Sequence, residues 1–181
     1  MISRRIIFLL TVLSVLLIQS GCATLSRDEC IRADWNRIGR QDGADGYPFE
    51  RIEEHRKACG EFGIGPNPAA YRQGRDQGLI FYCTPSNGYE QGKSGASYRY
   101  VCPHELEANF MRGFRVGTQV YDLSQQISQV DGKIRAKEKE LEKDKLPEEQ
   151  RKNLRDRIHD LERERNSLRT LRQTVELMAI F

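Results

Sequence analysis

Cysteine is the residue type in this chain whose number and spacing are best suited to covalent chemistry. The five cysteines are Cys22, Cys30, Cys59, Cys83 and Cys102. None belongs to a Cys-x-x-Cys unit, so their spacing gives no support for a zinc site. The three histidines are scattered, and His104-Glu105 lacks the second histidine of a zinc-protease helix. With no serine in a nucleophile-elbow setting either, we expect no catalytic residue, no metal site and no cofactor.

The first cysteine follows a stretch that is typical of a bacterial secretory signal. Arg4 and Arg5 form a cationic start, and residues 6–18 form an uncharged apolar run. A run of this length is too short to cross a membrane as a helix. Residues 1–21 are therefore predicted to be a signal peptide that is removed from the mature chain.

The end of this signal, Ser20-Gly21-Cys22, resembles the lipobox of bacterial lipoproteins, although Gln19 stands where that group usually has an apolar residue. The resemblance implies that Cys22 becomes the lipid-bearing N-terminus, with residues 22–29 as a short tether. Ordinary signal-peptide cleavage near Cys22 is the alternative. Ala23 replaces the aspartate associated with inner-membrane retention in the resembled lipoproteins, which implies an anchor in the outer membrane, facing the periplasm.

The remaining four cysteines are expected to form two disulfides, because exported chains keep their cysteines oxidised in pairs. Three pairings are open. Cys30 and Cys59 lie at the two ends of a predicted helix pair, and antiparallel packing would bring those ends together. The same reasoning joins Cys83 to Cys102. We favour Cys30–Cys59 and Cys83–Cys102, although the sequence alone leaves the other two pairings open.

Short helices separated by Gly- and Pro-rich turns are predicted to position these cysteines. Helices are expected over 28–44, 49–58 and 68–82, followed by a weaker segment and then by a longer helix that begins at Pro103. Together they predict a small cysteine-containing helical head over 30–117.

An aromatic residue followed by glycine three and seven positions later recurs in this head. It occurs as Tyr71-Gly74-Gly78 and as Phe110-Gly113-Gly117. Glycine inside a helix costs about 1 kcal/mol relative to alanine, so the repeat calls for a reason. Glycines four apart share a helix face and allow another backbone to approach closely, which is the interpretation we favour. The alternative is a ligand-binding groove lined by Trp35, Tyr71, Tyr82, Tyr89 and Tyr98, for which a glycan is one candidate ligand.

The order of cysteines, aromatic residues and glycines resembles the bacterial lipoproteins grouped as domain of unknown function 2799. The residues that carry the likeness are Cys30, Asp34, Trp35, Gly39, Asp42, Gly43, Cys59, Tyr71, Gly74, Gly78, Leu79, Tyr82, Cys83, Gly88, Gly92, Tyr98 and Cys102. The likeness covers roughly residues 22–117. It implies an envelope lipoprotein without an established activity.

The tail, over 103–181, has the heptad spacing of a coiled coil. Apolar residues alternate in steps of four and three at Val116, Val120, Leu123, Ile127, Val130 and Ile134. A turn is predicted near 144–147, because Pro147 with two acidic residues behind it is a helix-start signal. The same proline makes an uninterrupted intermolecular coiled coil less favoured.

The two predicted tail helices can be aligned by folding the chain at this turn. Apolar partners such as Ile134 with Ile158 and Val130 with Leu161 have residue numbers that add to 291 or 292. Carried further, the register pairs Val120 with Leu171 and returns Met178 and Phe181 to the head near Gly113 and Phe110. The fold class expected is all-α: a small disulfide-stapled helical head followed by a long antiparallel coiled-coil helical hairpin.

Charge and composition narrow the function further. The net charge is +3, and two of those charges, Arg4 and Arg5, leave with the signal peptide. Charges of both signs alternate after Gly132, as on a solvated helix surface, so no nucleic-acid partner is expected. The function expected is a non-enzymatic envelope lipoprotein, held to the membrane by its lipid, with a structural role or a protein partner bound through the hairpin. The alternative is a periplasmic ligand-binding module.

Replacing Cys22 tests the lipid anchor. Cys22→Ser removes the atom that would carry the lipid, so the protein should no longer fractionate with outer membranes. Ala23→Ser keeps Cys22 and serves as the control, which should remain membrane-bound. Density fractionation of cell envelopes measures both, and a Cys22→Ser variant found with the outer membranes would contradict the anchor.

Overall fold

The computed structural model describes residues 24–179, so the predicted signal peptide, Cys22, Ile180 and Phe181 lie outside the described residues. Within 24–179 the chain is helical and has no strand, and it contains two disulfides. These findings confirm the all-α class and the oxidised state predicted for the cysteines. The helices form two units, one of residues 24–43 and 47–77 and another of residues 44–46 and 78–179. The head predicted over 30–117 is therefore divided within its third long helix.

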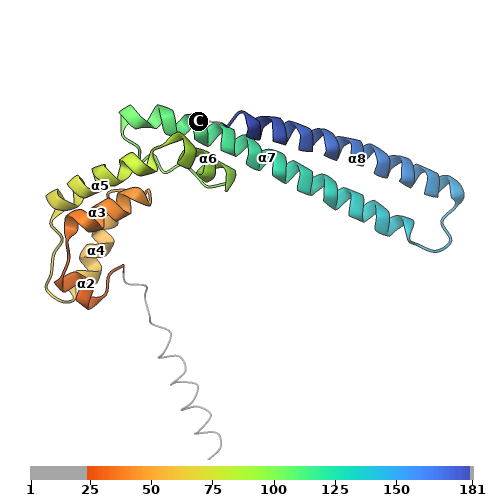
Figure 1. Ribbon diagram of the computed structural model, residues 1–181. Coiled ribbons are helices and arrows are strands. Elements are labelled where there is room, and N and C mark those ends of the chain that lie inside the picture. Colours follow the sequence, from red (N-terminus) through yellow and green to blue (C-terminus); the bar gives the residue numbers. More distant parts are fainter. Residues whose placement is uncertain (1–23, 180–181) are drawn as a thin grey trace, which may run out of the picture. The chain divides into compact units, whose positions relative to one another are not determined.

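The first unit is built from α2 (Arg27–Ile31), α3 (Trp35–Ala44), α4 (Arg51–Gly60) and most of α5 (Pro68–Tyr82) (Figure 1). A capping box starts α2: the Glu29 amide donates to the Ser26 hydroxyl, and the Ser26 amide donates back to the Glu29 carboxylate. A disulfide joins Cys30 to Cys59. It links α2 to the end of α4.

Helices α3 and α5 approach each other through glycine. A Cβ on Gly39 would overlap the carbonyl oxygen of Tyr71, and one on Gly74 would overlap the carbonyl oxygen of Asn36. Only a residue without a side chain permits this backbone contact, so the packing interpretation of the repeat is confirmed here.

The second unit contains the end of α5 with α6 (Pro85–Lys93), α7 (His104–Leu141) and α8 (Glu148–Leu177). Thr84 caps α6 through the Asn87 amide, with proline at the first helical position. A second disulfide, Cys83–Cys102, closes the segment that contains α6. Both disulfide pairings are those favoured from the sequence.

The same glycine contact recurs between α6 and α7. Carbonyl oxygens of α7 lie against Gly88 and Gly92, and carbonyl oxygens of Pro85 and Tyr89 lie against Gly113 and Gly117. Beside this contact lies the core of the second unit, whose buried members are Leu79, Tyr82, Cys83, Val101, Cys102 and Phe110. Each unit thus contains one glycine-mediated helix pair, which is the structural counterpart of the sequence repeat.

Beyond α6, helix α7 packs against α8, which runs back along it in the opposite direction (Figure 1). Val130 and Ile134 of α7 form a buried cluster with Leu161, and Ile158 and Leu168 pack against its sides. Asp131 also pairs with Arg165 at 3.3 Å across the two helices. No helix within residues 24–179 combines the length and the apolar character needed to cross a bilayer.

The predicted packing of Met178 on Gly113 is wrong, while the predicted pairing of Phe181 with Phe110 lies outside the described residues. Met178 is 71% exposed, and Leu171, which the register placed on buried Val120, is exposed as well. The reason is that α6 already covers the glycine face of α7, with the Pro85 carbonyl lying against Gly113. An apolar seam between α7 and α8 cannot continue where a third helix occupies that face.

Gly74→Ala tests the glycine contact between α3 and α5. The added methyl group would overlap the Asn36 backbone, so the free energy of unfolding should fall by about 3 kcal/mol or more. Gly60→Ala is the matched control, because a Cβ there meets nothing within 4 Å. This substitution should stabilise the helix by up to about 1 kcal/mol. Urea denaturation measures both variants. Equal effects of the two would contradict the role given to Gly74.

Candidate functional site

The five aromatic residues predicted to line one groove are divided between the two units. Trp35 and Tyr71 belong to the first unit, while Tyr82, Tyr89 and Tyr98 belong to the second. Tyr71 and Tyr82 are buried within their cores, and the other three are partly buried. Buried rings present no face to a ligand, so these two side chains contribute to packing instead.

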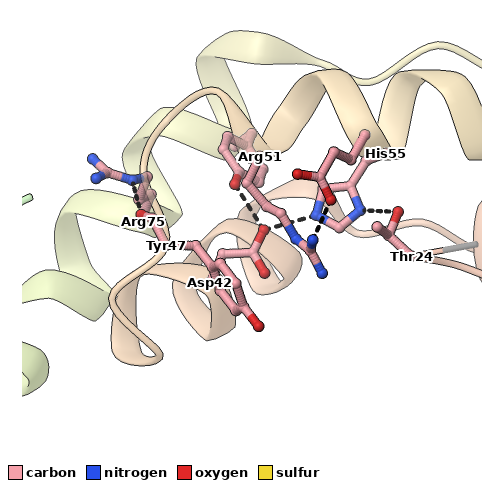
Figure 2. Close-up of polar contacts among 8 residues, drawn as sticks. Thr24, Asp42, Tyr47, Arg51, His55 and Arg75 are labelled. Atoms are coloured by element: carbon pink, nitrogen blue, oxygen red, sulfur yellow. Dashed lines mark hydrogen bonds and ion pairs between the residues drawn. The ribbon is translucent and has the colours of Figure 1, made fainter. Parts of the chain in front are cut away.

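In the first unit, polar side chains from three helices meet at one buried carboxylate, and Thr24 of the N-terminal segment contacts one of them, His55 (Figure 2). The Tyr71 hydroxyl of α5 donates to Oδ2 of Asp42 on α3 at 2.7 Å. His55 Nε2 of α4 lies 2.7 Å from the same oxygen, and His55 Nδ1 lies 2.8 Å from the Thr24 hydroxyl oxygen. We call these four residues the Asp42 cluster.

The Asp42 cluster is held by further contacts around it. The Tyr47 amide donates to the backbone carbonyl of Asp42 at 2.8 Å, and Arg75 Nε donates to the Tyr47 carbonyl at 3.0 Å (Figure 2). The Arg51 guanidinium lies over the Tyr47 ring, 4.5 Å from its centre. These contacts fix the backbone beside Asp42, while the Tyr71 hydroxyl and His55 Nε2 are the partners of its carboxylate and offset the cost of burying it.

The Thr24 hydroxyl, the His55 imidazole and the Asp42 carboxylate are bonded in the order that nucleophilic hydrolases use. However, Asp42 is 7% exposed and His55 is 3% exposed. Both ring nitrogens of His55 are already paired, Nε2 with Asp42 and Nδ1 with Thr24. With the Asp42 carboxylate accepting from Nε2, Nδ1 can accept from Thr24 when the imidazole is neutral and can donate to it when protonated. The arrangement joins α3, α4, α5 and residue 24, and its chemistry is that of a satisfied buried network.

Sequence reasoning missed the Asp42 cluster because its members are far apart in the chain. A signal was nevertheless present. Ile52, His55 and Cys59 lie three and four residues apart and share the buried face of α4, so His55 is the one polar residue on an otherwise apolar stripe. Asp42 similarly stands beside Gly39 and Gly43 on the buried face of α3. A polar residue on each of two facing stripes is a sign that the two are bonded.

Three tyrosines, Tyr71 of the first unit and Tyr82 and Tyr98 of the second, have a raised pKa. Burial, and then the hydrogen bond to Asp42, raises the pKa of Tyr71 far above its ordinary value. Burial raises the pKa of Tyr82, and burial followed by the hydrogen bond to Glu107 raises the pKa of Tyr98 to about 12. Each of these phenols stays protonated well above neutral pH.

A second candidate site is an open hollow of about 450 Å³ in the second unit. Four aromatic side chains line it, and its exposed rim includes one carboxylate, Asp122. Of the aromatic residues predicted from the sequence, Tyr98 is the one that lines it; Tyr100, Phe114 and Tyr121 were not predicted. Pockets of about 300–1,000 Å³ are typical of small-molecule sites.

The cysteines of residues 24–179 are all oxidised in disulfides and so cannot serve as nucleophiles or zinc ligands. In this part of the chain no three His, Cys, Asp or Glu side chains are grouped so as to hold a metal ion. The lipidation of Cys22 and the absence of an enzymatic activity stay predictions.

With both sites in place, the chain can be compared with known proteins. Residues 34–119 match a family described as protein of unknown function (DUF2799). The match supports the resemblance recognised in the sequence and spans both glycine-mediated helix pairs. Most of α7 beyond α6 and all of α8 lie outside it. No curated protein and no solved structure matches the chain.

The raised tyrosine pKa values predict a loss of stability in alkali. Above about pH 10 the unfolded chain releases tyrosine protons that the folded protein keeps, so the free energy of unfolding must fall as pH rises. Tyr71→Phe should cost about 1 kcal/mol at pH 8 by removing the bond to Asp42, and should make the decline above pH 10 shallower. Urea denaturation at pH 8 and pH 11 measures both effects.

Tyr100→Phe is the control for this experiment, because that ring is exposed to solvent and leaves the core unchanged. It should preserve both the stability at pH 8 and the steepness of the alkaline decline. If Tyr71→Phe loses stability with pH as steeply as the unmodified protein, the protonated Tyr71–Asp42 bond is not a source of the alkaline sensitivity.

Proposed function

We propose that this protein is an outer-membrane lipoprotein facing the periplasm, whose antiparallel coiled-coil arm presents a binding surface to a protein partner. The arm is the part of α7 beyond Leu123 together with the facing part of α8. The observation that carries the proposal is that this stretch of the second unit has one buried seam and otherwise polar, exposed faces.

The contacts of the arm support a coiled coil. Leu123, Ile127, Val130 and Ile134 are buried on α7 at alternating spacings of four and three. Leu161 is the buried residue of α8 and packs against Val130 and Ile134. A seam this narrow holds two helices together without forming the wider core of a globular domain. A short segment would have been enough to stabilise the compact helices, so the length of the arm favours a role as a spacer or as a surface that contacts a partner.

The start of the described chain supports attachment close to a membrane. Thr24 already contacts His55, and Ser26 already caps α2. Since Cys22 is two residues before Thr24, the predicted tether of 22–29 is mostly taken up by folded structure. A lipid on Cys22 would therefore hold the first unit at the bilayer surface.

Photo-crosslinking in intact cells tests the proposed arm surface. A photoreactive residue at exposed Asn153 of α8 should give a discrete cross-linked protein, while one at exposed Gln73 of α5 should not. Leu161→Asp should abolish the adduct, because a carboxylate in the seam separates α8 from α7. Asn166→Asp adds the same charge at an exposed position of α8 and should leave the adduct unchanged.

Hydrogen exchange on the purified variants shows that Leu161→Asp acts locally. Amides of the arm should lose protection while those of the disulfide-linked helices keep it. An adduct from Asn153 that survives Leu161→Asp, or equal adducts from Asn153 and Gln73, would show that the folded arm is not the binding surface.

A further inference from the structure

Tyr100 combines an unfavourable backbone conformation with a side chain that is mostly exposed to solvent. Its φ is +55°, in the left-handed region, which is unfavourable for a bulky residue. Its side chain is 82% exposed, so burial does not offset this cost. The next two residues, Val101 and Cys102, are buried in the core, and Cys102 is tied to Cys83. The constrained chain thus holds an aromatic ring out in the solvent.

That ring stands at the edge of the 450 Å³ hollow of the second unit. The Tyr100 and Tyr98 rings are 4.7 Å apart between centres, and Tyr98 lies 6.0 Å from Phe114, so three aromatic rings form one continuous wall. Tyr121 supplies another ring, and Gly95 lies against it with a φ of +76°, where any Cβ would press into the tyrosine. Glycine at 95 is therefore needed for the shape of the hollow.

The polar side chains that line the hollow are hydroxyls and one carboxylate. Ser97 and Thr118 contribute hydroxyl groups and Asp122 a carboxylate. The Thr118 hydroxyl donates to the Phe114 carbonyl at 2.9 Å, which leaves its oxygen able to accept. Among the residues that line the hollow none is Lys, Arg or His, so nothing there would attract an anion.

We infer that this hollow, walled by Tyr98, Tyr100, Phe114 and Tyr121 with Asp122 at its rim, is a binding site for a neutral saccharide. A sugar ring has an apolar face of C–H groups that stacks on an aromatic ring, and hydroxyls at its edge that need acceptors and donors. The aromatic wall meets the first requirement. Asp122, Ser97 and Thr118 meet the second.

A small organic cation is the competing ligand, because aromatic faces and a carboxylate also attract cations. The size of the hollow favours the saccharide, since about 450 Å³ far exceeds what a single ammonium group fills. The site lies entirely within the second unit, and its inference does not depend on the lipid anchor or on the arm.

Saturation-transfer NMR on the full folded chain tests the site with defined probes. Cellotriose, maltotriose and the trimer of N-acetylglucosamine represent neutral saccharides, and tetramethylammonium represents a cation. At least one saccharide should bind, and Tyr100→Ala and Asp122→Asn should each weaken it by about tenfold or more. Phe81→Ala is the matched control, because it removes a ring that is 70% exposed in the same unit but outside the hollow.

Binding that is weakened by both site variants and unchanged by Phe81→Ala would establish the saccharide site. Circular dichroism of each variant confirms that the helices remain folded, and Tyr100→Leu, which keeps an apolar side chain without the ring, should behave like Tyr100→Ala. The inference is overturned if no saccharide binds at about 10 mM, if Tyr100→Ala binds as well as the unmodified chain, or if tetramethylammonium binds more tightly than every saccharide.

Discussion

The fold depends on direct contact between helix backbones at glycine. In the first unit, Gly39 and Gly74 bring α3 and α5 together, and in the second Gly88 and Gly113 do the same for α6 and α7. The intrinsic helix cost of each glycine, about 1 kcal/mol, is offset because close approach lets neighbouring aromatic side chains pack more completely. The contact also explains why a modest apolar content suffices. Two disulfides then fix the ends of these short helices by limiting the freedom of the unfolded chain.

The glycine contact also determines how α7 is used along its length. Its first turns are covered by α6 at Gly113 and Gly117, and its later turns by α8 through Val130 and Ile134. The two modes differ physically: backbone contact needs small residues, whereas the seam with α8 needs branched apolar side chains at heptad spacing. One helix can carry both because they occupy successive stretches of the same face. Met178, at the C-terminal end of α8, is exposed and is not buried in the contact with α7.

Sequence reasoning predicted the features that depend on local spacing. Most of the helices, the disulfide partners and the glycine packing follow from turn residues, cysteine positions and a repeat that can be read within single segments. The single helix predicted over 28–44 is wrong, because the chain there forms two helices, α2 and α3. Sequence reasoning also failed where a third element decides the outcome. The register that returned Met178 to Gly113 was arithmetically sound for two helices, but it took no account of α6. The Asp42 cluster was missed for a related reason, because Asp42 and His55 acquire their roles only when α3, α4 and α5 meet.

The aromatic residues show how packing and function can be separated in a chain with few other clues. Tyr71 and Phe110 begin the two copies of the repeat, and both are completely buried. Packing in the two cores therefore explains why each copy begins with an aromatic residue. Tyr98 is intermediate, since one side of its ring packs on Phe110 while its hydroxyl bonds Glu107. Tyr100 has neither burial nor a favourable backbone. A strained and exposed ring is a cost to stability that the fold does not require, and a ligand that stacks on it would supply the missing reason.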